Sequence, residues 1–132
     1  MIITTIWMAL FRNESRTCLK INKITCTNFS GVMEVEVLLI PQSNKFLGCK
    51  SILMCENIEK GVGRVGSKVE IQFNSKVISR RHASFLLKHQ RLYLRDTGSS
   101  SGTFVNHSRL SAIGKESDFV EIKDGDLIQC NN

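Results

Sequence analysis

The sequence has few of the features that mark disordered or multidomain proteins. Among 132 residues there are one proline, one tryptophan and one tyrosine, while 42% of the residues are hydrophobic. A chain of this composition can bury an apolar core, whereas disordered segments are rich in proline and poor in hydrophobic residues. The length fits one domain and is too short for a catalytic domain with a regulatory partner. We therefore expect a single folded, soluble domain.

A long hydrophobic run is also missing. The apolar stretch Met1–Phe11 is shorter than the roughly 20 residues that cross a bilayer, has no positive residue before it and leads to no small-residue cleavage site. We expect neither a membrane span nor a signal peptide. Two alternatives stay open: the stretch packs on the domain as a strand or short helix, or it is a peripheral anchor centred on Ile6 and Trp7.

Cysteines at metal-binding spacing are absent. The five cysteines are odd in number, form no CxxC pair and have no histidine cluster nearby at zinc spacing. We expect reduced thiols that pack as small hydrophobic side chains, with no disulfide, metal site or cofactor, in a protein of the cytoplasm or nucleus. The cysteines are Cys18, Cys26, Cys49, Cys55 and Cys130.

No window of the sequence supports a long amphipathic helix, and short apolar segments predominate. Residues 33–40 alternate with period two up to Pro41, which removes a backbone donor and ends the strand. Residues 88–91 are polar and have the length of a hairpin turn. The pattern predicts an all-β sandwich in residues 34–132, after an extension of uncertain structure at residues 1–33. The predicted strands are 33–40, 51–55, 61–66, 69–73, 83–87, 92–95, 104–105, 119–122 and 127–130.

The net charge of +6 is concentrated in the middle of the chain. Residues 60–95 carry nine basic and one acidic residue, against six and five in residues 1–59 and three and six in residues 96–132. This pattern indicates a nucleic-acid surface, a phosphoprotein surface, or only solvated strand faces. The aromatic residues there are Phe73, Phe85 and Tyr93, two of them at core-like positions, which disfavours nucleic acid as a partner.

Four motifs occur in a fixed order along the chain: Gly63-Arg64, Ser79-Arg80-Arg81-His82, the segment Asp96–Asn106 and Asp124-Gly125-Asp126. In order and spacing they resemble the forkhead-associated (FHA) domain across roughly residues 34–130. The resemblance implies an FHA-type sandwich of two mostly antiparallel sheets whose loops at one end bind phosphothreonine in an extended peptide. The implied partners are phosphothreonine-containing proteins, docked in signalling or cell-cycle control.

The third motif is most similar to the FHA module of the fungal mitotic-checkpoint ubiquitin ligases, which join an FHA domain to a RING finger. No Cys/His zinc array follows Gln129, so ligase activity is not carried over from these proteins. We expect a binding module and not an enzyme.

The resemblance also assigns the site. A guanidinium suits phosphate because its planar fork fits two oxygens, and a short hydroxyl can donate without crowding the ligand. By position, the residues expected to bind the phosphopeptide are Arg64, Ser79, Arg80, Ser100 and Ser101. Those expected to brace the site are Gly63, His82, Gly102, Thr103 and Asn106.

Many FHA domains have, at the position of Ser101, an asparagine that grips the peptide main chain; serine is shorter and lacks the amide, so we expect a weaker or water-mediated grip. Ser79, His82 and Asp96 have the composition of a catalytic triad, but a serine three residues from its base lacks the turn and oxyanion arrangement of a nucleophile. No catalytic residue is predicted.

The C-terminus departs from the family as well. FHA domains close with a further strand beside their first one, and here only three residues follow Gln129. Three explanations stay open: the N-terminal extension supplies a substitute strand, the chain is a fragment of a longer product, or it is a degenerate member with an open edge at Glu34–Ile40. A degenerate member would be an interaction module that kept the fold and lost phosphate binding.

Overall fold

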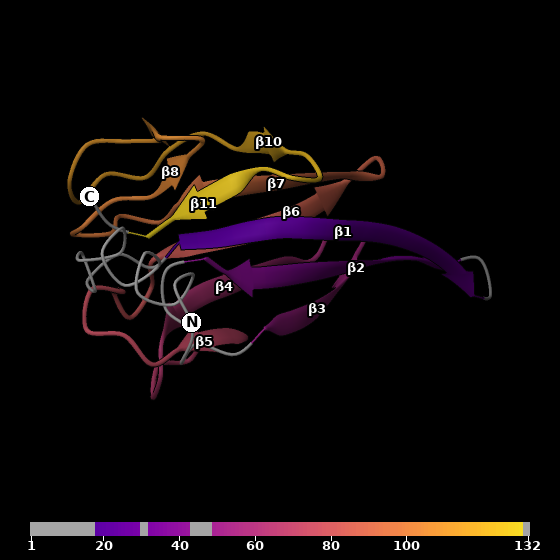
Figure 1. Ribbon diagram of the computed structural model, residues 1–132, viewed down its shortest axis with the longest axis horizontal. Coiled ribbons are helices and arrows are strands. Elements are labelled where there is room, and N and C mark those ends of the chain that lie inside the picture. Colours follow the sequence, from indigo (N-terminus) through magenta and orange to yellow (C-terminus); the bar gives the residue numbers. More distant parts are fainter. Residues whose placement is uncertain (1–17, 30–31, 43–48, 131–132) are drawn as a thin grey trace, which may run out of the picture.

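The computed structural model describes residues 18–29, 32–42 and 49–130, and the candidate anchor around Ile6 and Trp7 lies outside them. Two β-sheets pack face to face (Figure 1), and no helix that could span a membrane occurs in the described part of the chain. The strands are β1 Cys18–Phe29, β2 Val32–Pro41, β3 Lys50–Cys55, β4 Glu59–Arg64, β5 Ile71–Phe73, β6 Ala83–Lys88, β7 Arg91–Asp96, β8 Phe104–Val105, β9 Ser108–Arg109, β10 Val120–Ile122 and β11 Leu127–Gln129.

The strand order is β3-β2-β1-β11-β8-β9 in the first sheet and β10-β7-β6-β4-β5 in the second. Every described strand pair is antiparallel except β4–β5, which is parallel. The prediction of an all-β sandwich of two mostly antiparallel sheets is confirmed.

The core lies between the sheets and follows the period of two that strands impose on their side chains. In β2, Val35, Val37 and Leu39 are buried while Glu36 is exposed. Strand β7 repeats the pattern with its buried leucines, and the buried side chains of both sheets form one cluster. The alternation read from the sequence therefore determines which face of each strand meets the opposite sheet.

Strand β1 comes from the segment that the sequence leaves unassigned, and it lies in the interior of its sheet. It pairs antiparallel with β2 on one side and with β11 on the other, where Cys18 lies opposite Gln129. Leu19 and Ile21 are 2% and 0% exposed and join the core. Of the three explanations for the missing closing strand, the structure agrees with the first: the N-terminal segment supplies the strand beside β2, so that edge is covered.

The strand boundaries differ from the prediction in places. The segment predicted at 69–73 is a strand only from Ile71, and the two-residue strand β9 was not predicted. The predicted hairpin at residues 88–91 is present: His89 and Gln90 have φ of 51° and 64°, the left-handed pair that suits a two-residue turn between twisted strands.

The cysteines are only partly in the core. Cys18 and Cys130 are buried, and burial raises the pKa of the Cys130 thiol to about 12. Cys55 is half-buried, and Cys49 is exposed, so the prediction of a buried thiol is wrong at Cys49. The side chain of Cys26 lies outside the described part. Cys18, Cys49, Cys55 and Cys130 are not in disulfides.

Candidate functional site

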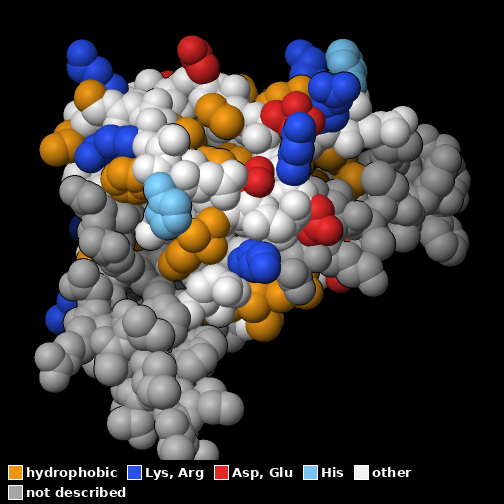
Figure 2. Space-filling view, turned by 45° about the horizontal axis from the view of Figure 1, so that its top comes forward, with side chains coloured by type: hydrophobic (Ala, Val, Ile, Leu, Met, Phe, Trp, Pro, Cys, Tyr) orange, Lys and Arg blue, Asp and Glu red, His pale blue; other side chains and the backbone are white. Residues whose placement is uncertain are grey.

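Three loops meet at one end of the sandwich: residues 65–70, 74–82 and 97–103. Strand β6 is antiparallel to both β4 and β7, so the end of β4, the start of β6 and the end of β7 lie together. This end is at the left in Figure 1. On the face drawn in Figure 2, Lys and Arg side chains lie at the far left, without Asp or Glu beside them, and also further to the right, where Asp and Glu side chains lie among them.

Arg64 and Arg80 line one open pocket of about 420 Å³. Arg64 ends β4, and its backbone N–H donates to the Ser79 carbonyl over 3.1 Å, which connects β4 to the loop that carries Arg80. Neither arginine makes an ion pair within the described residues. Two arginines without an acidic partner in the described part of the chain therefore line this pocket, and a guanidinium is suited to bind an anion.

The loop after β4 also lines this pocket, and hydrogen bonds hold it in place. The Ser67 hydroxyl donates to the Arg64 carbonyl over 2.5 Å, and the Gln72 amide donates to the Ser67 carbonyl over 2.8 Å. Ser67, Val65 and Gly66 line the pocket together with the arginines. These contacts fix the loop backbone beside Arg64 before any ligand binds.

Ser79 and Ser100 lie together although they belong to different loops. Their hydroxyl oxygens are 3.2 Å apart, and the Ser100 backbone N–H donates to the Ser79 hydroxyl oxygen over 3.2 Å. Ser100 is exposed and Ser79 is half-buried, so a ligand that reaches one hydroxyl is within reach of the other. The two loops thus offer a pair of hydroxyl donors.

His82 joins the same two loops from beneath. Its Nδ1 accepts a hydrogen bond from the Ser79 backbone N–H at 3.0 Å, and its Nε2 lies 2.9 Å from the Gly102 carbonyl oxygen. A carbonyl only accepts, so the ring is neutral with its proton on Nε2. Burial lowers the pKa of His82 below its ordinary 6.5, although the hydrogen bond to Gly102 and the charge of Asp96 act in the opposite direction.

Asp96 organises the turn that carries Ser100. One carboxylate oxygen accepts the backbone N–H groups of Gly98 and Ser99, each at 2.7 Å, and the other accepts the Ser99 hydroxyl and, at 2.7 Å, the Thr103 hydroxyl. Burial alone raises the pKa of this carboxyl, but these hydrogen bonds outweigh burial and lower it below the ordinary 3.8. The carboxylate is therefore a fixed acceptor under the loop.

The glycines of the motifs permit close packing. A Cβ atom on Gly63 would lie 2.0 Å from the Arg80 carbonyl oxygen, which no side chain tolerates. Gly102 has φ +97°, in the region that favours glycine, and its carbonyl faces His82. Gly63 allows β4 to approach the loop that carries Arg80, and Gly102 allows the turn above His82.

Ser101 is not grouped with the other serines. Its hydroxyl donates to the backbone carbonyls of Val77 and Cys130, over 2.6 Å and 3.4 Å. These bonds tie the loop to the neighbouring segments. The structure thus places Arg64 and Arg80 in one pocket and joins the Ser79 and Ser100 hydroxyls in the adjoining loops, where the Ser79 carbonyl accepts from the Arg64 backbone. The Ser101 hydroxyl lies against the protein backbone.

Asn106 does not line that pocket and lies in the tight turn between β8 and β9. Its amide donates to the Asp126 carboxylate over 3.0 Å and accepts the Leu127 backbone N–H at 3.0 Å, and its φ is +47°. The side chain therefore connects this turn to the start of β11. These are the contacts of a bracing residue.

The three residues with the composition of a catalytic triad do not form one. His82 accepts from the backbone N–H of Ser79 and makes no described hydrogen bond to the Ser79 hydroxyl. The Asp96 carboxylate is occupied by Ser99, Thr103 and Gly98 and does not orient the imidazole. The geometry is that of a braced binding loop.

Comparison with known proteins identifies the family. The family model described as the FHA domain matches residues 61–130. The chain belongs to the FHA-domain family. FHA domains are non-catalytic interaction modules that bind phosphorylated proteins, and the braced loops described above lie within the matched residues.

Individual relatives of this FHA domain are longer proteins. The chain is 47% identical to the probable E3 ubiquitin-protein ligase dma1 of Schizosaccharomyces pombe over 64 residues, which are 48% of this chain and 24% of that protein. It is 36% identical to an uncharacterized protein of the same yeast over 104 residues, 73% of this chain and 34% of that one. The chain thus spans about a third or less of the length of these relatives.

Among solved structures, the FHA domain of the CT664 protein from Chlamydia trachomatis matches with a TM-score of 0.47 and 16% sequence identity. The match covers 86% of this chain and 94% of that one.

No role is predicted from the sequence for two pairs of residues that shape the site of this FHA domain. Asp96 and Ser99 form the hydrogen-bonded turn under Ser100, and an aspartate followed by Gly98 and serines is the pattern of such a turn. Ser67 and Gln72 hold the pocket wall, and nothing in their local sequence marks them, because the contact depends on how β5 lies beside β4.

Proposed function

We propose that this FHA domain binds phosphothreonine in extended segments of partner proteins and so docks these partners in signalling or cell-cycle control, in the cytoplasm or nucleus. The observation that carries the proposal is that Arg64 and Arg80, which make no ion pair within the described residues, line one pocket next to the loops that carry the hydroxyl pair of Ser79 and Ser100. A phosphate dianion needs this combination of fixed charge and oriented donors.

Hydrogen bonds from Arg64, Arg80, Ser79 and Ser100 would be sufficient for a measurable affinity for a phosphopeptide. Hydrogen bonds to charged groups contribute about 1.5–3 kcal/mol each. Three or four of them, reduced by the costs of desolvation and of ordering the peptide, correspond to a dissociation constant of roughly micromolar. The preference for phosphothreonine over phosphoserine is implied by the family, and the experiment below compares the two.

The similarity to a probable ubiquitin ligase supports the docking role. In a protein that joins this module to a catalytic domain, phosphate recognition would select the substrates on which that domain acts. For this chain we propose the recognition step alone.

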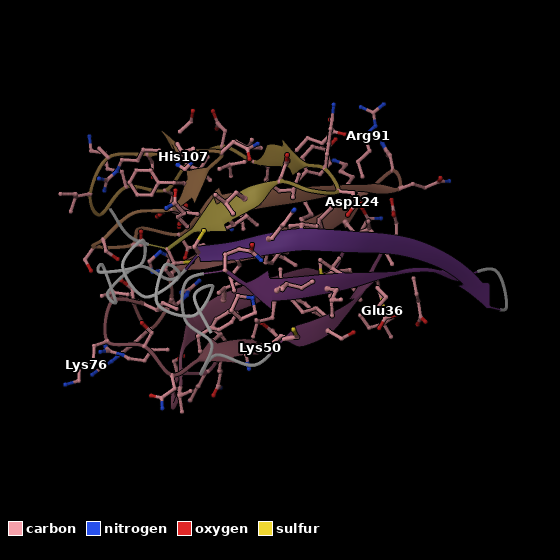
Figure 3. All side chains as sticks on the ribbon, viewed as in Figure 1. Glu36, Lys50, Lys76, Arg91, His107 and Asp124 are labelled. Carbon is pink, nitrogen blue, oxygen red and sulfur yellow. The ribbon has the colours of Figure 1, made fainter. Side chains whose placement is uncertain are left out.

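The test is fluorescence-polarisation binding of a degenerate phosphothreonine peptide library, with its phosphoserine and unphosphorylated counterparts, to the intact chain and to Arg64→Ala. Arg91→Ala is a matched control, because Arg91 lies at the opposite end of the sandwich (Figure 3), where it pairs with Glu121. We expect phosphothreonine-selective binding that Arg64→Ala abolishes and Arg91→Ala leaves intact.

Absence of binding by a folded chain would contradict the proposal and favour a module that retains only the fold. Strongly salt-dependent binding that ignores the phosphate would also contradict it.

A further inference from the structure

The cations around the binding pocket lack acidic partners. Within the described residues there are three ion pairs, and all are made by Arg91 and Arg95. Residues 64–80 carry four basic side chains and one acidic one. The basic residues are Arg64, Lys68, Lys76 and Arg80, and none of them is in an ion pair there.

The nearby carboxylates of Glu70 and Asp96 accept hydrogen bonds from other groups. Glu70 accepts the backbone N–H of Gly61 at 2.6 Å, on β4. Asp96 is 1% exposed and its two oxygens are occupied by the turn beneath Ser100. Within the described residues neither carboxylate is in an ion pair with these four cations, and this end keeps a net positive charge.

One phosphate does not use all of this charge. A phosphothreonine side chain carries about −1.5 to −2 charges, which Arg64 and Arg80 together can balance. Lys68 and Lys76 remain. Both are exposed; Lys68 follows the pocket-lining Ser67 in sequence, and Lys76 projects from the same end of the sandwich (Figure 3).

We infer that the preferred ligand carries a second anionic group, a phosphorylated or acidic residue within about three residues of the phosphothreonine, attracted by Lys68 and Lys76. This rests on the proposed function. An extended peptide advances about 3.3 Å per residue, so three residues span the roughly 8–10 Å over which exposed charges interact at moderate salt.

A peptide fits this surface better than a nucleic acid. Binding of single strands depends on exposed aromatic rings on which bases stack. In the basic stretch 60–95, Phe73 and Phe85 are 1% and 3% exposed, so both rings belong to the core. The charge is exposed at this end, but these rings offer no stacking surface.

The test compares a singly phosphorylated phosphothreonine peptide with peptides that carry one additional phosphoserine, moved stepwise from three residues before the phosphothreonine to three after it. We expect about three- to tenfold tighter binding at one or more positions in low salt, the size expected for exposed charges acting at this range. In the double variant Lys68→Ala/Lys76→Ala the gain should shrink to less than twofold, while binding of the singly phosphorylated peptide stays within about threefold.

Lys88→Ala is the matched control, because Lys88 is exposed and lies in the hairpin with Arg91 at the opposite end. If the singly phosphorylated peptide binds and no position of the second phosphate improves affinity, this inference is overturned and the proposed function stands. If no phosphopeptide binds, the proposed function fails and this inference fails with it. Equal competition by an oligonucleotide of the same charge would overturn the choice of a peptide ligand.

Discussion

The hydroxyl oxygens of Ser79 and Ser100 lie 3.2 Å apart although 21 residues separate the two serines along the chain. One comes from the loop before β6 and the other from the loop after β7, and these strands are neighbours in the sheet. The pair exists because His82 and Asp96 hold the two loops from below. Each of these relationships leads to a measurable consequence.

Removal of either hydroxyl should weaken phosphopeptide binding, and removal of both should cost less than the sum. We expect Ser79→Ala and Ser100→Ala each to reduce affinity about tenfold, roughly 1.4 kcal/mol, as for a hydrogen bond to a charged group. Because the two hydroxyls contact each other, a double-mutant cycle measured by isothermal titration calorimetry should give a coupling free energy above about 0.5 kcal/mol. Independent losses that simply multiply would show that the ligand does not engage the pair.

Protonation of His82 should destabilise the domain. The folded state lowers the pKa of His82 below the ordinary 6.5, because burial favours the neutral ring and Nδ1 accepts from Ser79. The unfolded chain therefore binds the proton more readily, so this contribution is fully present above pH 6.5 and is lost as the pH falls toward the lowered pKa. Urea unfolding at pH 7 and at pH 5 should show a smaller unfolding free energy at pH 5.

His82→Gln should have a lower unfolding free energy at pH 7 and a smaller difference between the two pH values. His89→Gln, in the exposed hairpin turn, is the control and should keep the pH dependence of the original chain. A pH dependence that survives unchanged in His82→Gln would assign the titration to another group.

Truncation of a side chain in β1 should destabilise the whole domain. Leu19 is 2% exposed and lies opposite Ile128, so Leu19→Ala should lower the unfolding free energy by about 2–5 kcal/mol in urea titrations. Leu53→Ala, at a position that is 45% exposed, should change it by less than about 0.5 kcal/mol. A loss below about 1 kcal/mol for Leu19→Ala would mean that β1 is a detachable extension.

A methyl group on Gly63 should disturb both stability and binding. Gly63→Ala places Cβ against the Arg80 carbonyl, so we expect a loss of about 1–3 kcal/mol and a weakened affinity for phosphopeptide as the loop shifts. Gly125 has a φ of +89°, which strains any other residue, but a Cβ atom added there would have no non-neighbouring atom within 4 Å. Gly125→Ala should therefore lower stability and leave binding unchanged. Thermal unfolding and fluorescence polarisation on the same samples separate the two effects.

The sequence by itself determined the class of fold and supplied the candidates for the site. The alternation in residues 33–40 and 92–95 was sufficient because a strand buried on one face repeats every two residues, whatever lies opposite. The glycines and serines around the Ser79 motif and in the third motif were sufficient to place Ser79 and Ser100 in loops, because turn residues act locally.

The tertiary structure alone decided which elements meet. Cys18 pairs with Gln129 across almost the full length of the chain, and no local preference states which strand fills the edge of β2. In the same way, Ser100 and Ser101 are adjacent and chemically identical, yet one hydroxyl faces Ser79 and the other the carbonyl of Val77. Pairing between distant strands and the direction of a side chain in a turn depend on neighbours far away in sequence, so they are settled only when the two sheets pack together.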